Sequence, residues 1–535
     1  MWRENPQNGD LRHAFVLMLG REIIMNATKN KFVDVPAARL LAPLALAVSL
    51  AACGGGGSSS GGGGANGGGE NPVGYQFPQD MPADVPQQEI ACGGDDAIML
   101  DANNITDSAK IAFLDAQDGD VIAFPEGRFD LNDTLTLDGE LGGARIADIT
   151  ICGQGMDKTI LDFSNSVGDD GLFITNINDV EVYGLAVVEA ANNAIKFQHA
   201  DGVRINYTAT VWQGEPDKGN GAYGLYPVES SNVLVENSYV RGSADAGVYV
   251  GQSQNIVVRN NVAEYNVAGI EIENSTGADM YNNIARFNTG GLLVFDLPIG
   301  NGTYGSGVRV FGNTVTENNT KNFANSSSNP GGVHIVPPGT GVIVLSTDDV
   351  EIFDNEIADH DTLAVAVTSF FIADENAAGP DYQSIIADGW LPVVRNIHVH
   401  DNAITNAGSA PNGALIQDMI TLFTLTPELQ WPGILYDGLG EQLANSSALL
   451  PVADAYEEGE KVCFQNNGDT LIGYPYDPAT AATMSGPTLS PAVGADLLDC
   501  SQPALPAATL TFKGEQFGCG VDDTTSEHCK PAPVL

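Results

Sequence analysis

Short stretches of alternating apolar and polar residues recur along the middle of the chain with a period close to 22 residues. The segment 254–266 aligns with 276–288 at an offset of 22, and an earlier copy begins at Ser231. Apolar residues alternate with polar ones within each copy, as in a β-strand that buries one face. Shorter copies of the motif follow at 308–313, 350–355 and 397–402. Repetition at this period predicts a stack of similar coils.

One copy is too short to bury its own apolar residues, so the copies are expected to stack. In-register stacking at about 4.8 Å pairs the backbone of each coil with the next and encloses one core. Asparagine recurs at the corners, where it tolerates left-handed backbone and can bond to the same residue one coil away. Two ladders are predicted. The first consists of Asn261, Asn283, Asn313, Asn355 and Asn402, and the second consists of Asn266, Asn288 and Asn318. The predicted fold class is therefore all-β, a parallel β-helix.

The second strand of each repeat carries a different outward residue in each coil. These strands read Gly-Val-Tyr-Val at 247–250 and Gly-Ile-Glu-Ile at 269–272, with further copies at 290–294 and 332–335. Because the apolar residues face inward, alternation turns one other side chain per coil outward. The predicted outer column is Lys196, Tyr226, Tyr249, Glu271, Leu293, His334 and Ala366.

Long segments that lack the repeat pattern interrupt the coils beside these strands. They are 212–223, 296–306, 319–331, 337–347 and 373–395. Inserted loops of this length are usually functional or unstructured. Their aromatic residues, Trp212, Tyr304, Tyr382 and Trp390, are expected to wall a groove that suits an extended polymer.

The segments that flank the repeats are predicted to close the stack. Residues 91–148 form an N-terminal cap with a short helix at 105–116, since an uncovered first coil would present unpaired strand edges. The coils extend over 149–410, and 411–535 is a C-terminal segment. Six of the seven cysteines lie after residue 90, and an even number in an exported chain predicts disulfides, with the pairing left open. The candidates are Cys92, Cys152, Cys463, Cys500, Cys519 and Cys529.

The first 90 residues predict export and a tether. Basic residues precede the apolar run 40–52, which ends in Leu-Ala-Ala before Cys53. We interpret 1–52 as a secretory signal peptide, with translation starting at Met25, and 53–90 as a Gly/Ser-rich linker. Leu-Ala-Ala-Cys resembles the lipobox of bacterial lipoproteins. That resemblance implies a lipid on Cys53, membrane contact through this anchor only, and the cell envelope, at the outer membrane of a Gram-negative bacterium.

The charge balance narrows the range of partners. The chain has 22 Lys and Arg against 68 Asp and Glu, a net charge of −46. A surface this acidic repels phosphate backbones, which excludes nucleic acid as the expected partner. Hydrophobic residues make up 43%, too many for a disordered chain.

These motifs resemble the right-handed parallel β-helix, or pectin-lyase-like, superfamily, and more narrowly the bacterial parallel β-helix repeat lipoprotein family. The residues that carry the resemblance are 149–162, 224–228, 290–298, 322–324 and 336–341. The resemblance implies a right-handed helix with about 22 residues per coil, an N-terminal cap and long inserted loops. Members of the narrower family are often encoded beside an exported di-haem cytochrome-like protein, which implies such a protein as a partner.

The outer column offers candidate chemistry. Lys196 and His334 are candidate bases, and Tyr249 or Tyr226 is the candidate acid, for proton transfer next to a uronate carboxyl group, as in a lyase or C5-epimerase. The candidate substrate-binding residues are Tyr226, Glu271, Trp212, Tyr304 and Trp390. Glu271 is also a candidate ligand for Ca²⁺, the one cofactor suggested. For each of these side chains an ordinary exposed strand position is the alternative.

His398 and His400 stand two apart on one predicted strand. They are a candidate pair of ligands for a divalent metal, and a hydrated outer face is the alternative.

Two functions are expected from these features. The first is a cell-envelope protein that binds, and cleaves or epimerises, an acidic polysaccharide, with Ca²⁺ offsetting the repulsion between two polyanions. The second is a non-catalytic scaffold that docks an exported cytochrome-like protein or another envelope partner. The missing catalytic signatures of related enzymes favour the scaffold, whereas the outer column and long loops favour the polysaccharide.

Overall fold

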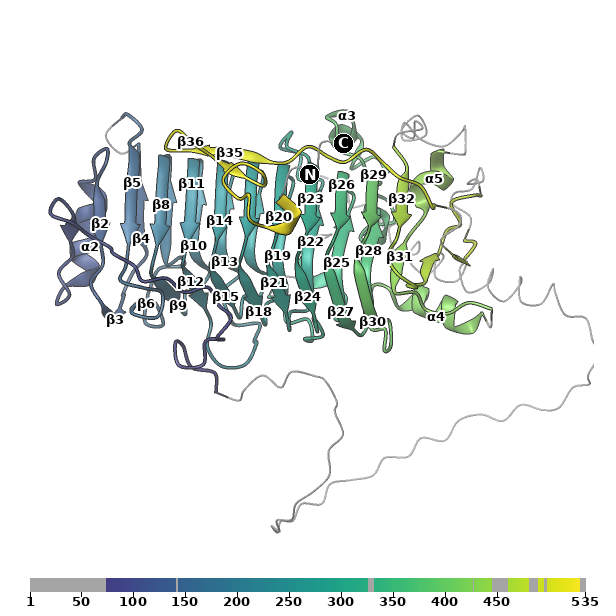
Figure 1. Cartoon of the computed structure of the whole chain (residues 1–535), viewed down its shortest axis with the longest axis horizontal. Coiled ribbons are helices and arrows are strands. Elements are labelled where there is room, and N and C mark those ends of the chain that lie inside the picture. The colour runs from purple at the N-terminus through teal and green to yellow at the C-terminus, as the bar shows by residue number, and fades with distance from the viewer. Residues whose placement is uncertain are drawn as a thin grey trace, which may run out of the picture. The chain divides into compact units, whose positions relative to one another are not determined.

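In the computed structural model the coils stack along one axis (Figure 1). The structure describes residues 74–140, 143–325, 332–426, 428–444, 460–480, 489–494 and 498–529. The predicted signal peptide, Cys53 and the first part of the linker lie outside these residues. Within the described ranges, no helix has both the length and the apolar character needed to cross a membrane.

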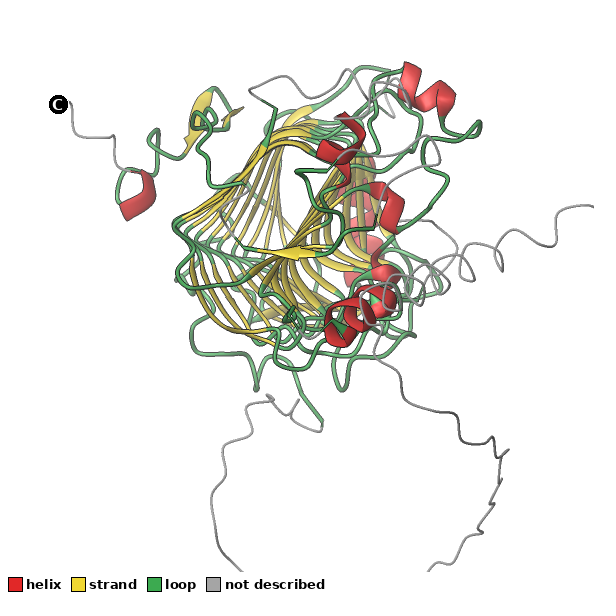
Figure 2. Cartoon of the chain, turned by 90° about the vertical axis from the view of Figure 1, so that its right-hand side faces the viewer, coloured by secondary structure: helices red, strands yellow, loops and turns green. Residues whose placement is uncertain are grey.

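Three sheets, named A, B and C, surround one core, and a typical coil contributes one strand to each (Figure 2). Sheet A consists of β1 (Ile98–Met99), β2 (Val121–Ala123), β5 (Ala147–Cys152), β8 (Asn178–Tyr183), β11 (Asp201–Asn206), β14 (Ser231–Glu236), β17 (Gln254–Arg259), β20 (Thr276–Tyr281), β23 (Ser306–Phe311), β26 (Asp348–Phe353), β29 (Arg395–His400) and β32 (Val462–Gln465). Sheet B consists of β3 (Gly127–Asp130), β6 (Thr159–Asp162), β9 (Ala186–Val188), β12 (Ala209–Val211), β15 (Tyr239–Arg241), β18 (Val262–Glu264), β21 (Ile284–Arg286), β24 (Thr314–Thr316), β27 (Glu356–His360) and β30 (Ala403–Ala407). Sheet C consists of β4 (Leu135–Asp138), β7 (Leu172–Thr175), β10 (Asn193–Gln198), β13 (Tyr223–Val228), β16 (Ala246–Gly251), β19 (Ala268–Glu273), β22 (Gly290–Phe295), β25 (Thr340–Leu345), β28 (Leu363–Thr368), β31 (Ile434–Tyr436), β33 (Ile472–Tyr474) and β34 (Ala492–Val493).

The register confirms the repeat. Ile256 lies opposite Ala278, and Val258 lies opposite Met280, so the offset of 22 residues is one coil. These four side chains are fully buried in a core that runs along the stack. The predicted fold class, a parallel β-helix, is therefore confirmed.

Asparagine ladders follow the corners as predicted. Asn283 donates from Nδ2 to Asn313 Oδ1 at 3.0 Å and accepts the same bond from Asn261 at 3.0 Å. The second ladder continues from Asn288 to Asn318 at 2.9 Å. All these amides are buried, and each ladder bond satisfies a polar group that would otherwise destabilise the core. Each ladder continues by one residue that was not predicted. Asn467 accepts a hydrogen bond from Asn402 in the first ladder, and His360 contacts Asn318 in the second.

The ends and turns carry the short helices. Helix α2 (Ile105–Leu114) packs Ile105, Ala109 and Phe113 against the first coils, as predicted for the cap. After residue 410 strands β31, β32 and β33 still extend sheets A and C. The other helices within the described residues are η1 (Val333–Ile335), η2 (Phe370–Ile372), α3 (Gln383–Ala387), α4 (Gln417–Leu425), α5 (Leu439–Ala444) and η4 (Glu527–Cys529).

Two predicted elements exchange places near residue 340. The segment 332–335, predicted as a strand of the second column, is the turn η1, whereas β25 lies within the predicted loop 337–347. Two consecutive prolines, Pro337 and Pro338, end the first segment, and proline cannot donate to a sheet ladder. β25 has the required alternation and pairs in register with β22.

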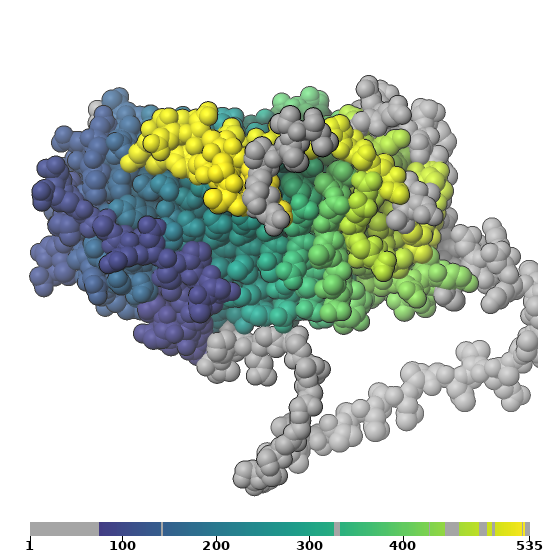
Figure 3. All heavy atoms as spheres, viewed as in Figure 1, coloured from purple at the N-terminus to yellow at the C-terminus, as the bar shows by residue number. Residues whose placement is uncertain are grey.

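The predicted cysteines form three disulfides, Cys92–Cys152, Cys463–Cys500 and Cys519–Cys529. Cys463–Cys500 links β32 to a C-terminal segment that runs back over sheet A, and Cys519–Cys529 closes a loop within this segment. The segment contains the hairpin β35 (Thr509–Phe512) and β36 (Glu515–Gly518), yellow in Figure 3. The hairpin packs Leu510 and Phe512 on outward residues of sheet A.

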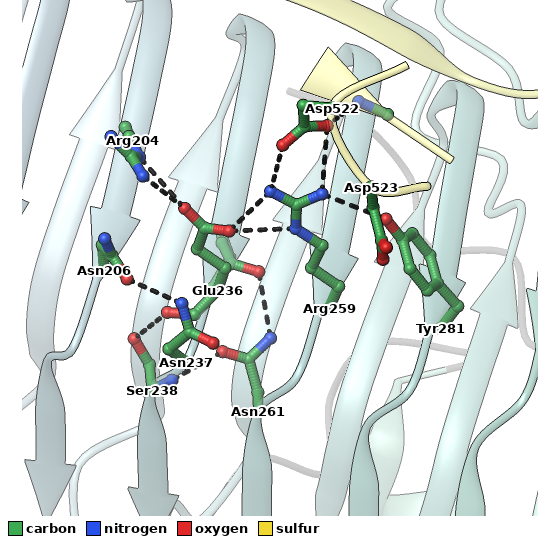
Figure 4. Close-up of polar contacts among 12 residues, drawn as sticks. Arg204, Asn206, Glu236, Asn237, Ser238, Arg259, Asn261, Tyr281, Asp522 and Asp523 are labelled. Carbon is green, nitrogen blue, oxygen red and sulfur yellow. Dashed lines mark hydrogen bonds and ion pairs between the residues drawn. The ribbon is translucent and has the colours of Figure 1, made fainter. Parts of the chain in front are cut away.

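Ion pairs also attach this segment. Arg259 on β17 pairs with Glu236 on β14 and with Asp522 beyond the hairpin, at 2.7 Å in both cases (Figure 4). Arg204 binds the other oxygen of Glu236 at 2.7 Å. On sheet B the N-terminal residues Tyr75 and Phe77 cover the outer face in a similar way.

Candidate functional site

The outer face of sheet C carries the predicted column. Lys196 lies opposite Tyr226, and Tyr249 lies opposite Glu271, in adjacent pairs of strands. Leu293 follows Glu271 in the column. His334 does not belong to it: Ile343 of β25 occupies that position, and His334 lies half-buried in η1. His334 is therefore not a member of the column in which Lys196 and Tyr249 lie.

The middle of the column is covered, which corrects the prediction of an exposed shelf. Tyr249 is 4% exposed and Glu271 only 1%. Tyr249 belongs to an apolar cluster, and the rings of Tyr223, Tyr226 and the loop residue Phe323 pack against this cluster. Tyr249 and Glu271 share one face, as predicted, but neither presents a surface on which a sugar ring can stack.

Three carboxyl groups, one of them that of Glu271, lie close together beside Tyr249. Asp245 precedes β16, while Glu271 and Glu273 are alternate, outward residues of β19. We call Asp245, Glu271 and Glu273 the carboxyl cluster. Tyr249 donates its hydroxyl to Glu273 Oε1 at 2.9 Å, and Gln252 Nε2 donates to the Tyr249 hydroxyl at 3.1 Å. Glu271 Oε2 is buried without a hydrogen-bond partner.

The environment of the cluster favours protonated carboxyl groups. Burial, with the charge of Glu273 next, raises the pKa of Asp245 to about 8. Burial also raises the pKa of Glu273 to about 7, against the opposing effect of the hydrogen bond from Tyr249. Burial and both neighbouring carboxylates hold the pKa of Glu271 well above its ordinary value. Perturbed carboxyl groups of this kind are typical of sites that transfer protons.

Three tyrosines adjoin the cluster, and one lysine lies beside the outermost of them, Tyr226. The ring centroid of Tyr223 lies 4.4 Å from that of Tyr226 and 4.8 Å from that of Tyr249. Burial raises the pKa of each of these tyrosines, so all three hydroxyls remain protonated donors. The ammonium group of Lys196 lies 5.4 Å from the ring centroids of Phe173 and Tyr226, a favourable position for a cation.

A polar groove of about 650 Å³ runs beside the cluster, at the corner between sheets C and A. We call it the corner groove. Its wall is built from the same corner of successive coils, and it includes His199, Glu229, Gln252 and Thr276. Gln252 connects the groove to the cluster, because its amide also donates to Glu273 Oε1 at 3.4 Å. A groove that crosses coils in this way suits an extended chain.

The predicted aromatic wall differs from the structure. Trp212 and Trp390 are buried, and each indole N–H donates to a backbone carbonyl, of Ala190 and Asp296 respectively. Both side chains anchor their loops and present no ring to a ligand. Tyr304 is partly exposed, but its hydroxyl is bonded to Asp388 at 3.0 Å.

Two residues of the cluster were missed by the sequence analysis. Glu273 follows Glu271 by two positions, so the same alternation predicts that it also points outward. Asp245 lies in a corner, where no periodicity marks it.

Glu271 was also predicted as a ligand for Ca²⁺. Within the described ranges, one group of three side chains has potential metal-ligand atoms that all lie within 4.8 Å of one another. This group is on sheet A and does not include Glu271.

The stability of the protein should fall as pH rises from about 4 to 8. A carboxyl group whose pKa is raised in the folded protein keeps its proton at pH values where the unfolded chain has already lost it. The contribution of this group to stability is therefore complete at low pH, and it disappears as pH rises through the folded-state pKa. Each such proton contributes a slope of about 1.4 kcal/mol per pH unit. We expect Glu271→Gln to flatten this slope in urea unfolding measured across that interval.

The matched control for this prediction is Glu89→Gln, which changes an exposed carboxyl group far from the cluster. Equal slopes for the two variants and the unchanged protein would show that Glu271 does not resist ionisation.

The match to a protein-family model agrees with the fold. Residues 170–336 match the family model described as "Right handed beta helix region", so both sequence and topology identify this part of the chain as a right-handed parallel β-helix. No curated protein sequence matches the chain. Among solved structures, the A-module of a mannuronan C-5 epimerase from Azotobacter vinelandii is 15% identical with a TM-score of 0.40, over 70% of this chain and 93% of that one. A polygalacturonase from Erwinia carotovora is 10% identical with a TM-score of 0.35, over 61% and 97%. The catalytic unit of an α-1,3-glucanase from Streptomyces thermodiastaticus is 14% identical with a TM-score of 0.35, over 59% and 56%.

Proposed function

We propose that this protein binds a polysaccharide along the corner groove and cleaves it by proton transfer from the carboxyl cluster. The observation that carries the proposal is Glu273, a half-buried carboxyl group whose pKa is raised to about 7 beside an open polar groove. Both of its hydrogen-bond donors, Tyr249 and Gln252, bind Oε1. Oε2 is then the oxygen that carries the proton for the leaving glycosidic oxygen, and a water molecule supplies the hydroxyl group to the sugar carbon that loses this oxygen.

An acidic polysaccharide remains the proposed substrate class. Near neutral pH, the protonated carboxyl groups of the cluster are hydrogen-bond donors and leave it with little negative charge. Lys196 adds a positive charge beside Tyr226. Donors and a cation suit a uronate carboxylate. The overall charge of −46 opposes the approach of a polyanion, so we expect Ca²⁺ to strengthen binding.

An anchored position at the outer membrane is part of the same proposal. The Leu-Ala-Ala-Cys53 motif and the Gly/Ser-rich linker support it, since a tethered β-helix would meet glycans of the cell envelope.

Binding to a glycan panel tests the proposal. Alginate, pectate, a glycosaminoglycan and a neutral glucan would be titrated calorimetrically, with and without EDTA. We expect an acidic glycan to bind, and Lys196→Met and Gln252→Ala to weaken binding at least about 10-fold, or 1.4 kcal/mol. Gln117→Ala, on the exposed surface of the cap, is the matched control.

Failure of every glycan to bind would overturn the polysaccharide proposal. It would favour the alternative of a scaffold for an exported cytochrome-like or other envelope protein. Binding that is unaffected by EDTA would remove Ca²⁺ from the proposal and leave the groove in place.

A further inference from the structure

A second cluster of functional side chains lies on the outer face of sheet A, away from the corner groove. Glu351 on β26 lies opposite His398 on β29, and His400 follows two residues later on the same strand. Potential ligand atoms of the three side chains all lie within 4.8 Å of one another. We propose that Glu351, His398 and His400 bind one divalent transition-metal ion, for which Zn²⁺ is the best fit.

The distance between two of the ligands already suits zinc. His400 Nε2 lies 3.2 Å from Glu351 Oε1. Two ligands of a tetrahedral zinc ion, each about 2.0–2.1 Å from the metal, are about 3.3 Å apart. An ion can therefore replace the proton that His400 shares with Glu351 after only a small movement of the two side chains.

The groups behind these ligands hold them in the orientation that a metal requires. His400 Nδ1 lies 2.7 Å from Asp401 Oδ2, so an Nδ1–H donated to this carboxylate would leave Nε2 to bind the metal once the proton shared with Glu351 is displaced. A carboxylate behind a histidine is the usual outer partner at a zinc site. The second oxygen of Glu351 accepts the backbone N–H of Leu505 at 3.0 Å.

His398 is the independent sign that a ligand is missing from this cluster. It is only 6% exposed, and neither ring nitrogen has a hydrogen-bond partner. Its ring stacks on His400 with the centroids 3.9 Å apart. Buried polar atoms are nearly always satisfied, and a metal ion bound by one ring nitrogen would satisfy it here.

The site lies where the C-terminal segment begins to cross sheet A. Leu505 of this segment bonds to Glu351, while Cys463 lies opposite His398 and forms the disulfide with Cys500. A bound ion would therefore stabilise the contact between sheet and segment. With three protein ligands, the fourth position of a tetrahedral ion would hold water.

Metal titration of the whole chain, produced without a histidine tag, tests the proposal. The protein would be stripped with a chelator, titrated with Zn²⁺ alone by calorimetry, and analysed for bound metal after gel filtration. We expect one zinc per chain and a raised Tm on binding. Glu351→Gln and His398→Asn should each weaken binding at least about 100-fold, and Asp401→Asn about 10- to 100-fold.

The matched control is His199→Gln, which removes a histidine that pairs with Glu229 at 2.9 Å without a second histidine beside it. Its zinc affinity should equal that of the unchanged chain. Bound Co²⁺ should give visible absorption bands that His398→Asn abolishes. Substoichiometric zinc in the unchanged chain, or equal affinity in Glu351→Gln, would overturn the proposal, and Glu351→Gln decides the outcome if His398→Asn does not fold.

Discussion

Replacing Glu273 with glutamine should lower the rate of polysaccharide cleavage by about 100- to 10,000-fold, the usual contribution of a general acid. Glutamine keeps the shape of the side chain and still accepts the bond from Tyr249, but it has no proton to give to the leaving oxygen. Polysaccharide affinity should therefore change little. Release of reducing ends and titration of the same substrate would measure the two effects separately.

The pH dependence of the rate gives a second test of the same role. Because the pKa of Glu273 is raised to about 7, the rate should fall as pH rises through that value, as the proton donor is lost. Glu229→Gln is the control, since Glu229 also lines the corner groove but is exposed and pairs with His199. If Glu273→Gln cleaved as fast as Glu229→Gln, Glu273 would not be the proton donor.

The fold follows from the sequence because the repeat fixes it locally. Alternation around Ile256 and Val258 defines which side chains enter the core, and Asn261 and Asn283 mark one corner. A shift of one residue would expose the apolar set, so only one register satisfies the pattern. The column from Lys196 to Glu271 could be predicted for the same reason.

The cover over that column could not be predicted, because the inserted loops have no repeat that fixes their conformation. Trp212 and Trp390 look like ligand-binding aromatic residues in sequence, but backbone carbonyls within reach of their indole N–H groups allow both to be buried. The raised pKa values of Asp245 and Glu273 arise from burial in the folded protein. The identity of the acid therefore depends on tertiary packing, which periodicity does not encode.

Replacing Arg259 with methionine should destabilise the protein by about 3–5 kcal/mol, the usual cost of removing one partner from a buried ion pair. The side chain of Arg259 is 7% exposed and that of Glu236 only 5%. The variant would leave Glu236 buried with Arg204 alone and would also release Asp522 from sheet A. Urea unfolding would measure the loss of stability, and limited proteolysis would show earlier cleavage within the segment after residue 498.

The control for this prediction is Lys110→Met, which breaks an exposed pair with Asp133 and should cost less than about 1 kcal/mol. Asp522→Asn separates the two roles of Arg259, because it weakens the attachment of the C-terminal segment while Arg259 and Glu236 stay paired. We expect its loss of stability to lie between those of the other two variants. If Arg259→Met were no less stable than Lys110→Met, the hairpin and the Cys463–Cys500 disulfide would be sufficient to hold the segment on sheet A.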